Sequence, residues 1–283
     1  MIPIRRGREP AQLALVRSRE QAKLQSIAGM RHPTGDDITG YQCVAKDLWR
    51  GQYYKCCYCE LKLPVAYNDV EHYRPKARAD RVPGSSETHG YWWLAHSWEN
   101  LLFACSTCNR SQKNDRFPLK NGSVVLQPLQ TPPGQELPLL LDPAAAINPV
   151  VHIQFEYRTL LGFPGPKQWF AQPRNGSKLG EMTIEVCGLN DAGLVELRKD
   201  HVARVVMEKV SDLEDGLRRG DSAHVQRVFT NARGLLDPGN AFVALTYDAL
   251  CQLIPPSKLS PLGLGWPEPK EVGMPPRHQA ARR

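Results

Sequence analysis

Apolar residues near the start of the chain recur at helical intervals. The positions are Leu13, Val16, Leu24 and Ile27. Because a helix completes a turn about every 3.6 residues, these side chains fall near one face, with Pro10 before the pattern and Gly29 after it. The pattern predicts a helix over residues 11–30. A second, short helix is expected over residues 43–54 (CVAKDLWRGQYY).

The second half of the chain begins with strand patterns and continues with helical ones. Residues 151–163 (VHIQFEYRTLLGF) alternate like a strand or a hairpin arm, and residues 183–189 (TIEVCGL) are expected to form another strand. That strand runs into Asn190, a residue type that often begins helices. Helices are then predicted over residues 194–217, 222–236 and 240–254.

Prolines divide the chain into parts. Seven of them interrupt residues 118–149 around one apolar run, LPLLLDP, and this stretch is the best domain boundary. The predicted parts are an N-terminal helical segment (1–50), a core that carries the chemistry (51–120), a proline-rich connection (121–150), a strand-plus-helical C-terminal region (151–254) and a flexible basic tail (255–283).

The net charge of +7 favours polyanionic partners such as nucleic acid, although an ordinary solvated surface accounts for a modest excess as well. The first residues do not resemble a signal peptide, and no apolar run is long enough to cross a membrane. We therefore expect a cytoplasmic protein without a membrane partner.

Four cysteines form two pairs with metal-binding spacing. Cys56 and Cys59 make one Cys-x-x-Cys pair, and Cys105 and Cys108 make the other. Two such pairs close a tetrahedron around zinc and leave no position for a substrate, so they predict a structural zinc site. Cys57 has the wrong spacing to join the set, and the other three are expected to be small core residues: Cys43, Cys187 and Cys251.

The segments DVEHYRPK and WENLLFACSTCNRSQKNDRFPL, placed around the second cysteine pair, resemble HNH nucleases. The HNH pattern is a carboxylate–histidine step at the end of a strand, an asparagine in the following loop, and a helix after the second cysteine pair that ends in histidine or asparagine. Those positions are Glu71 with His72, Asn100 and Asn114. The resemblance implies an α+β protein with a ββα-metal (His-Me finger) core on the zinc knuckle.

The resemblance also implies a role for each of these residues. His72 is the base that activates water, Asn100 orients its ring, and Glu71 with Asn114 binds a catalytic divalent cation, Mg²⁺ or Mn²⁺. Neighbouring residues of a regular strand face opposite ways, so Glu71 and His72 serve one site only if the strand ends or bends there. Pro75 makes such an end plausible.

Helical geometry suggests how the two metals are separated. If a helix begins near Cys105, Asn114 points about 180° away from that cysteine, so the zinc and the active site occupy opposite faces. Arg110 would share the face of Asn114 and contact a phosphate, with Lys113 and Lys76 as further candidates. Solvated surface charge is the alternative for these cations. Tyr91, Trp92, Trp93 and Trp98 are expected to pack around the knuckle rather than to stack on bases.

Most of the chain is similar to the PtuB nuclease subunits of Septu-type and related retron anti-phage systems. The similar segments include CCYCE, VEHYRPK, GYWWLAHSWENLLFACSTCNRSQKNDRFPL, LPLLLDP, HIQF and TIEVCGLN. The resemblance implies a DNA endonuclease that acts with a PtuA-type ATPase partner, which would dock on the helical region of residues 190–254.

Two alternatives remain open at the level of sequence. The HNH centre could be inactive, which would leave a zinc-knuckle module that binds nucleic acid or a partner; Glu71 in place of the commoner aspartate is the hint for it. The substrate could instead be RNA, including tRNA, since the chemistry requires only a phosphodiester.

Overall fold

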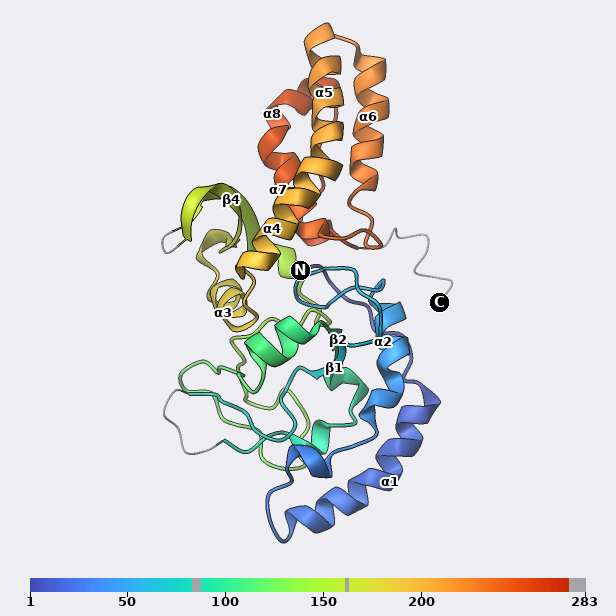
Figure 1. Ribbon diagram of the computed structural model, residues 1–283, viewed down its shortest axis with the longest axis vertical. Helices are drawn as coiled ribbons and strands as arrows, with labels where there is room; N and C mark the ends of the chain where they lie inside the picture. The colour runs from blue at the N-terminus through green and yellow to red at the C-terminus, as the bar shows by residue number, and fades with distance from the viewer. Residues whose placement is uncertain (83–87, 161–162, 275–283) are drawn as a thin grey trace.

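The computed structural model describes residues 1–82, 88–160 and 163–274 (Figure 1). Within this part the protein is a mixed α+β structure, as expected, with two antiparallel sheets of two strands each. In the first, β1 (Asp69–His72) pairs with β2 (Leu101–Ala104). In the second, β3 (Ile153–Leu160) pairs with β4 (Phe163–Pro173), so the hairpin predicted from residue 151 onward is confirmed.

The N-terminal helices cover one face of the first sheet. Helix α1 (Ala11–Ala28) and the short helix α2 (Ala45–Gly51) confirm the two predicted helices, and α2 follows a 3₁₀ turn, Tyr41–Val44. Apolar side chains of these segments pack against the strands in one buried cluster. Its members include Leu13, Val44, Leu48, Leu101 and Phe103.

Strand β2 is buried on both faces, which explains its continuous apolar sequence. Its four residues alternate between two cores: Leu101 and Phe103 face the N-terminal helices, while Leu102 and Ala104 belong to the main core. In that main core they pack with the paired cysteines and with the C-terminal helices. A short strand with no solvent-facing side is thus the centre of the fold.

The C-terminal region is helical, and its helices pack on the β3–β4 hairpin and on one another (Figure 1). Its helices are α3 (Lys178–Val186), α4 (Ala192–His201), α5 (Met207–Arg219), α6 (Ser222–Gly234), α7 (Val243–Leu253) and α8 (Pro256–Leu259). A π-helical turn, Val202–Val206, joins α4 to α5. The helical prediction for residues 194–254 is confirmed.

The strand predicted over residues 183–189 is wrong, because this segment is the end of α3 and the turn after it. The helix begins at the Ser177 cap, whose side chain accepts a hydrogen bond from the backbone N–H of Gly180, and it buries Gly180, Thr183 and Val186 at helical spacing. Gly188, at φ 58°, then lets the chain turn sharply. The alternation of TIEV is therefore local and does not reflect the face that is buried.

Asn190 does not cap the next helix as expected. Its side chain instead bonds both the N–H and the C=O of Ala171 in β4, at 2.8 and 3.0 Å. Asp191 caps α4 by accepting from the backbone N–H of Gly193. Asn190 thus joins the helical region to the hairpin.

The predicted flexible tail is wrong for residues 255–274. This segment forms α8 and two 3₁₀ turns, Ser260–Leu262 and Pro269–Glu271. Val272 is buried, and the Trp266 indole donates a hydrogen bond to the carbonyl of Ile254. The basic end of the tail, residues 275–283, lies outside the described residues.

A buried carboxylate joins the cysteine-bearing turn to the C-terminal helices. Glu60 follows Cys59 directly and accepts hydrogen bonds from the backbone N–H groups of Val243 and Ala244 at the start of α7. Its carboxylate also lies 3.7 Å from the buried ammonium of Lys55. Negative charge at a helix N-terminus is favourable, and burial strengthens the effect.

The Glu60→Ala substitution should lower the free energy of unfolding by about 3 kcal/mol, because it removes the acceptor of the helix N–H groups and the carboxylate that compensates the buried charges of Lys55 and of the Met1 α-ammonium. Urea unfolding followed by circular dichroism measures this. Glu181→Ala, which breaks an exposed pair with Lys178, is the control and should cost less than about 0.5 kcal/mol. Equal losses in the two variants would contradict the proposed role of Glu60.

Candidate metal centre and active site

The two cysteine pairs meet in one buried cluster. Cys56 and Cys59 lie in the turn after α2, Cys105 directly follows β2, and Cys108 lies in the helical turn Thr107–Lys113. The four sulfur atoms all lie within 4.8 Å of one another. All eight cysteines fall in the described part of the chain, and none forms a disulfide.

The cluster has the dimensions of a tetrathiolate zinc site. The Sγ atoms of Cys59 and Cys105 are 3.9 Å apart, close to the separation of about 3.8 Å that zinc–sulfur bonds of about 2.3 Å impose in a tetrahedron. The backbone N–H of Cys108 also donates to Cys105 Sγ, at 3.4 Å. These residues therefore could hold a zinc ion.

The remaining cysteines lie outside this cluster. Cys57 and Cys187 are buried thiols, and burial raises the pKa of each above its ordinary value. Cys251 is partly buried, whereas Cys43 is exposed. The expectation of a core residue is therefore wrong for Cys43, which lies in the 3₁₀ turn before α2.

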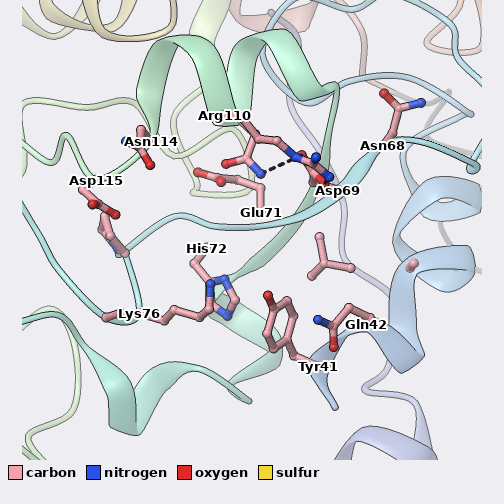
Figure 2. Close-up of a pocket in the computed structure, with 15 residues that line it drawn as sticks. Tyr41, Gln42, Asn68, Asp69, Glu71, His72, Lys76, Arg110, Asn114 and Asp115 are labelled. Carbon is pink, nitrogen blue, oxygen red and sulfur yellow. Dashed lines mark hydrogen bonds and ion pairs between the residues drawn. The ribbon is translucent and has the colours of Figure 1, made fainter. Parts of the chain in front are cut away.

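A pocket of about 530 Å³ lies beside the end of β1 (Figure 2). It collects residues from the N-terminal 3₁₀ turn, from β1 and the loop after it, and from the helical turn that follows the second cysteine pair. The polar lining residues are Tyr41, Gln42, Asn68, Asp69, Glu71, His72, Lys76, Asn109, Arg110, Asn114 and Asp115. Most of the residues expected from the HNH pattern are thus brought to one place.

The strand ends where the two neighbouring residues both need to reach the pocket. Asp69–His72 is the whole of β1, and Glu71 and His72 both line the pocket. Beyond His72, the backbone N–H of Tyr73 donates to the carbonyl of Asn100. The end of the strand therefore removes the conflict that regular strand geometry would create.

The surroundings of His72 favour the neutral imidazole. Its Nε2 lies 3.0 Å from the carbonyl oxygen of Ala95. A carbonyl can only accept, so Nε2 carries the proton and Nδ1 keeps its lone pair. Burial, together with the positive charge of Lys76, holds the pKa of His72 well below its ordinary value. The Tyr41 ring packs edge-on against the imidazole, with centroids 4.6 Å apart.

Asn100 supports the His72 region through the backbone and not through the ring. Its Oδ1 accepts from the N–H of Arg74 at 2.8 Å, and its Nδ2 donates to the carbonyls of Arg74 and Leu94, at 3.0 and 3.2 Å. Leu94 precedes Ala95, whose carbonyl accepts from His72. The direct orienting contact expected from the sequence is therefore replaced by a brace between the two segments that position the imidazole.

Glu71 is buried between two donors. Lys113 Nζ lies 2.6 Å from Glu71 Oε1, and the Tyr58 hydroxyl donates to the same oxygen at 3.1 Å. Burial raises the pKa of Glu71, whereas the Lys113 charge opposes that rise. Both donors bond the same oxygen, Oε1.

Lys113 is not positioned as a nucleic-acid contact. Its side chain is fully buried, and besides the Glu71 carboxylate it donates to the backbone carbonyl of His72 at 3.0 Å. The sequence suggested an exposed cation, but the helical turn directs this residue inward. The buried Lys113 ammonium therefore compensates the negative charge of the Glu71 carboxylate.

The segment that carries Asn114 is not the α-helix that the sequence suggested. Residues Thr107–Lys113 form a π-helical turn, and Asn114 follows it at φ 44° and ψ −119°. The estimate of about 180° between Cys105 and Asn114 therefore does not apply. The wider turn and the left-handed residue at its end nevertheless bring Asn114 to the pocket lining, away from the sulfur cluster.

Arg110 and Lys76 are the accessible cations of the pocket. Arg110 is 68% exposed, and its Nε donates to Asp69 Oδ2 at 2.9 Å. Lys76 Nζ lies 5.1 Å from the centroid of the Tyr41 ring. Both candidates therefore border the pocket, with Arg110 ion-paired at its edge.

Six polar residues of the pocket were missed by the sequence analysis: Tyr41, Gln42, Asn68, Asp69, Asn109 and Asp115. Asn109 Nδ2 donates to Asp69 Oδ2 at 3.1 Å, which joins the strand to the π-helical turn. Asp69 stands two residues before Glu71, on the same face of the strand, and that spacing was the available signal. Tyr41 comes from the N-terminal segment, and no sequence signal connected it with the pocket.

The aromatic residues around the knuckle are core residues, as expected. Tyr91, Trp92 and Trp98 are buried, and Trp93 packs against the main core. Tyr91 lies edge-on to Phe117, with ring centroids 5.5 Å apart. They stabilise the structure around the pocket and do not line it.

Together these features define a mixed α+β protein with a buried four-cysteine cluster that could hold a metal, and a polar pocket that His72 lines. Septu protein PtuB of Bacillus mycoides (strain KBAB4) is 34% identical over 230 residues, which cover 77% of this chain and 72% of that protein. The chain therefore belongs to the Septu PtuB family.

A second relative is Septu protein PtuA of the same strain. It is 27% identical over 145 residues, which make up 51% of this chain and 18% of that protein. No protein-family model matches the chain. No solved structure matches it either. In the described residues, no helix has the length and apolar character needed to span a membrane.

The purified protein should carry a single zinc ion per chain, held by the four clustered thiolates. Cys59→Ser should lose the metal, because a hydroxyl does not replace a thiolate ligand of zinc. Cys57→Ser is the matched control: a buried neighbouring thiol outside the cluster, so zinc should remain. Elemental analysis by mass spectrometry measures both, and zinc that survives Cys59→Ser would contradict the ligand set.

Proposed function

We propose that the protein is a metal-dependent HNH endonuclease that hydrolyses phosphodiester bonds of DNA, as the nuclease component of a Septu defence system. The observation that carries the proposal is the geometry of His72: its Nε2 is bonded to a backbone carbonyl, and the imidazole shares one pocket with a carboxylate and several amides. The order of β1, β2 and the π-helical turn, set on a cysteine cluster, supports a ββα-metal core.

The donors of the pocket fit a hard divalent cation. Glu71 offers Oε2, since Tyr58 and Lys113 both bond Oε1, and Asn114 offers an amide oxygen at the same pocket. Asn109 is a second amide candidate, because only its Nδ2 is bonded to Asp69. Carboxylate and amide oxygens are the ligands that Mg²⁺ and Mn²⁺ prefer. Such a cation would neutralise charge on the phosphate and on the leaving oxygen.

The residues of this chain would supply the proton chemistry. His72 takes a proton from the attacking water at Nδ1, while its Nε2–H remains bonded to Ala95. Asn100 holds the two backbone segments on either side of this bond, so the imidazole keeps its orientation. The Lys113 ammonium lowers the cost of keeping the Glu71 carboxylate ionised while buried.

Arg110 and Lys76 would bind the phosphates that flank the cleaved bond. The Arg110–Asp69 pair is solvent-exposed on the arginine side, so exchanging the carboxylate for a phosphate costs little free energy. A guanidinium also matches a phosphate through two parallel hydrogen bonds. Lys76 lies on the opposite border of the pocket, beside Tyr41.

The His72→Ala substitution should reduce Mg²⁺- or Mn²⁺-dependent cleavage about 100-fold or more, because general-base catalysis typically contributes that much. Plasmid and RNA cleavage assays, with and without an ATPase partner, measure this. Zinc content should equal that of the unmodified protein, which separates loss of the base from loss of the fold.

Undiminished cleavage by this variant would show that the active-site assignment is wrong. Inactivity of the unmodified protein on every substrate and with every partner would favour the alternative of a non-catalytic nucleic-acid or partner-binding module. Cleavage of RNA but not of DNA would keep the active site and change its substrate.

The pH dependence of cleavage should reflect the lowered pKa of His72. A base is active above its pKa, so the acid side of the pH–rate profile should lie below the ordinary histidine value of about 6.5. Single-turnover rates between about pH 5 and 8 measure it. A half-maximal rate at or above the ordinary value would mean that the protonated histidine is not disfavoured in the active protein.

We further propose that a PtuA-type ATPase is the partner, because Septu protein PtuA shares the Septu name with the PtuB relative and is also similar to part of this chain. Its docking surface would be the helical region of residues 190–254. Helices α5 and α6 project from the rest of the molecule (Figure 1), and Leu197 and Met207 are exposed apolar residues of this region.

Replacing both Leu197 and Met207 with Asp should weaken co-purification with such an ATPase at least about tenfold, because charged groups would enter an apolar contact. Affinity capture of co-expressed subunits measures this. Met30→Asp is the control. Met30 is an exposed apolar residue in the turn after α1, so this variant should bind the ATPase normally. Unchanged capture by the double variant would place the partner elsewhere.

A further inference from the structure

Tyr58 lies inside the turn that joins Cys56 to Cys59, and its side chain is fully buried. Its hydroxyl donates a hydrogen bond to Glu71 Oε1 at 3.1 Å. Glu71 belongs to β1 and lines the pocket. The hydrogen bond therefore joins the cysteine-bearing turn directly to the pocket.

The acceptor of the Tyr58 hydroxyl is a carboxylate, although a backbone carbonyl would also satisfy a buried phenol. Tyr73 is a buried tyrosine of the same hydrophobic core, and its hydroxyl donates to the carbonyl of Leu140 at 2.6 Å. Tyr58 donates instead to a side chain that lines the pocket. The need to satisfy a buried hydroxyl therefore does not by itself account for this partner.

The backbone around Tyr58 is held on both sides. The flanking residues, Cys56 and Cys59, place their sulfur atoms in the four-cysteine cluster. Within the turn, the backbone N–H of Cys57 donates to the carbonyl of Phe103 in β2, at 3.0 Å. A tyrosine side chain has only two rotatable torsions, so a fixed backbone and a buried ring also fix the position of the hydroxyl.

The Glu71 carboxylate has a second partner, and the two partners differ in charge. Lys113 Nζ lies 2.6 Å from the same oxygen, Oε1. An ammonium compensates the carboxylate but repels a cation nearby, whereas a neutral hydroxyl orients the carboxylate without that repulsion. Tyr58 is therefore the partner that holds Glu71 in place without opposing a divalent cation.

We propose that Tyr58 is a positioning residue of the pocket, whose hydroxyl orients the Glu71 carboxylate for the divalent cation. The inference rests on the proposed function, because it takes Glu71 as a ligand of that cation. The cation would use Oε2, the oxygen that neither of the two contacts described above involves. Groups that hydrogen-bond a metal ligand fix its orientation, and their removal typically lowers metal affinity about 10- to 100-fold.

This hydrogen bond would also make the pocket depend on the cysteine cluster. Because two cysteines of the cluster bound the turn that carries Tyr58, the position of its hydroxyl follows the position of the cluster. A metal ion among the sulfur atoms would thus preorganise a ligand of the pocket without contacting it.

The test is the affinity of the full-length, zinc-containing protein for Mn²⁺, measured from the electron paramagnetic resonance signal of free Mn²⁺. Tyr58→Phe should weaken Mn²⁺ binding about tenfold, because it removes the donor and keeps the ring. The spectrum of bound Mn²⁺ should also change, since it depends on the arrangement of the ligands. In cleavage assays, saturating Mn²⁺ should restore most of the rate, so that the variant differs in its Mn²⁺ requirement more than in kcat.

Two variants separate the orientation of Glu71 from general effects on the core. Tyr73→Phe removes a buried hydroxyl that bonds a backbone carbonyl, so it should lower stability and leave Mn²⁺ affinity unchanged. Glu71→Gln removes the carboxylate and should weaken Mn²⁺ binding more than Tyr58→Phe does. Elemental analysis should find the same zinc content in all of these proteins.

If Tyr58→Phe does not retain zinc, two non-natural residues at position 58 provide the comparison. 4-Aminophenylalanine keeps a hydrogen-bond donor at the end of the ring, and 4-fluorophenylalanine has a similar shape without a donor. The protein with the donor should bind Mn²⁺ more tightly, because it can still orient the Glu71 carboxylate.

Mn²⁺ affinity within twofold of the unmodified protein in Tyr58→Phe, while Glu71→Gln weakens binding, would overturn the role of Tyr58 and keep the proposed cation site. Equal losses in Tyr58→Phe and Tyr73→Phe, or equal affinities for the two non-natural variants, would also overturn that role. Mn²⁺ binding that Glu71→Gln does not weaken, or no binding to the unmodified protein, would overturn the proposed cation site and this inference with it.

Discussion

The structure depends on four thiols that meet in one buried cluster. The turn between Cys56 and Cys59 is held at this cluster, where its residues contact both the pocket and the C-terminal helices. Tyr58, inside that turn, donates to the Glu71 carboxylate in the pocket. Glu60, just after it, accepts from the first N–H groups of α7. The second cysteine pair fixes the end of β2 and the start of the π-helical turn. A shift of the cluster would therefore disturb the pocket and the helical region together.

Buried charges around this cluster are paired with groups that compensate them. The Lys113 ammonium compensates the charge of the Glu71 carboxylate, and the Nε2 proton of His72 is directed to a carbonyl, so its Nδ1 keeps a lone pair. Each of these groups is buried, so each interaction is stronger than its counterpart on the surface would be. The exposed Arg110 differs, because exchanging its carboxylate partner, Asp69, for another anion costs little free energy.

Much of the site could be predicted from the sequence because its signals are local or chemically specific. The spacing of two Cys-x-x-Cys pairs identifies a metal cluster, and the Glu71–His72 step at a strand end identifies a candidate base and ligand. The predictions that were wrong concern backbone geometry, which the spacing of residues along the sequence does not encode. The π-helical turn sends Lys113 inward and changes the direction of Asn114. The alternation in TIEV belonged to a helix, because a cap at Ser177 lay upstream of the pattern. Tyr41 comes from a distant segment, and only the folded chain places it in the pocket.

The central claim is that two metal sites share one scaffold, a permanent zinc among the thiolates and an exchangeable hard cation in the pocket. Crystals soaked in Mn²⁺, with anomalous diffraction recorded at the zinc and manganese edges, test it most directly. The account predicts a zinc peak between Cys56, Cys59, Cys105 and Cys108, and a manganese peak beside Glu71 in the pocket that His72 lines. Manganese among the sulfur atoms, or no manganese in the pocket of crystals that contain zinc in the cluster, would contradict it.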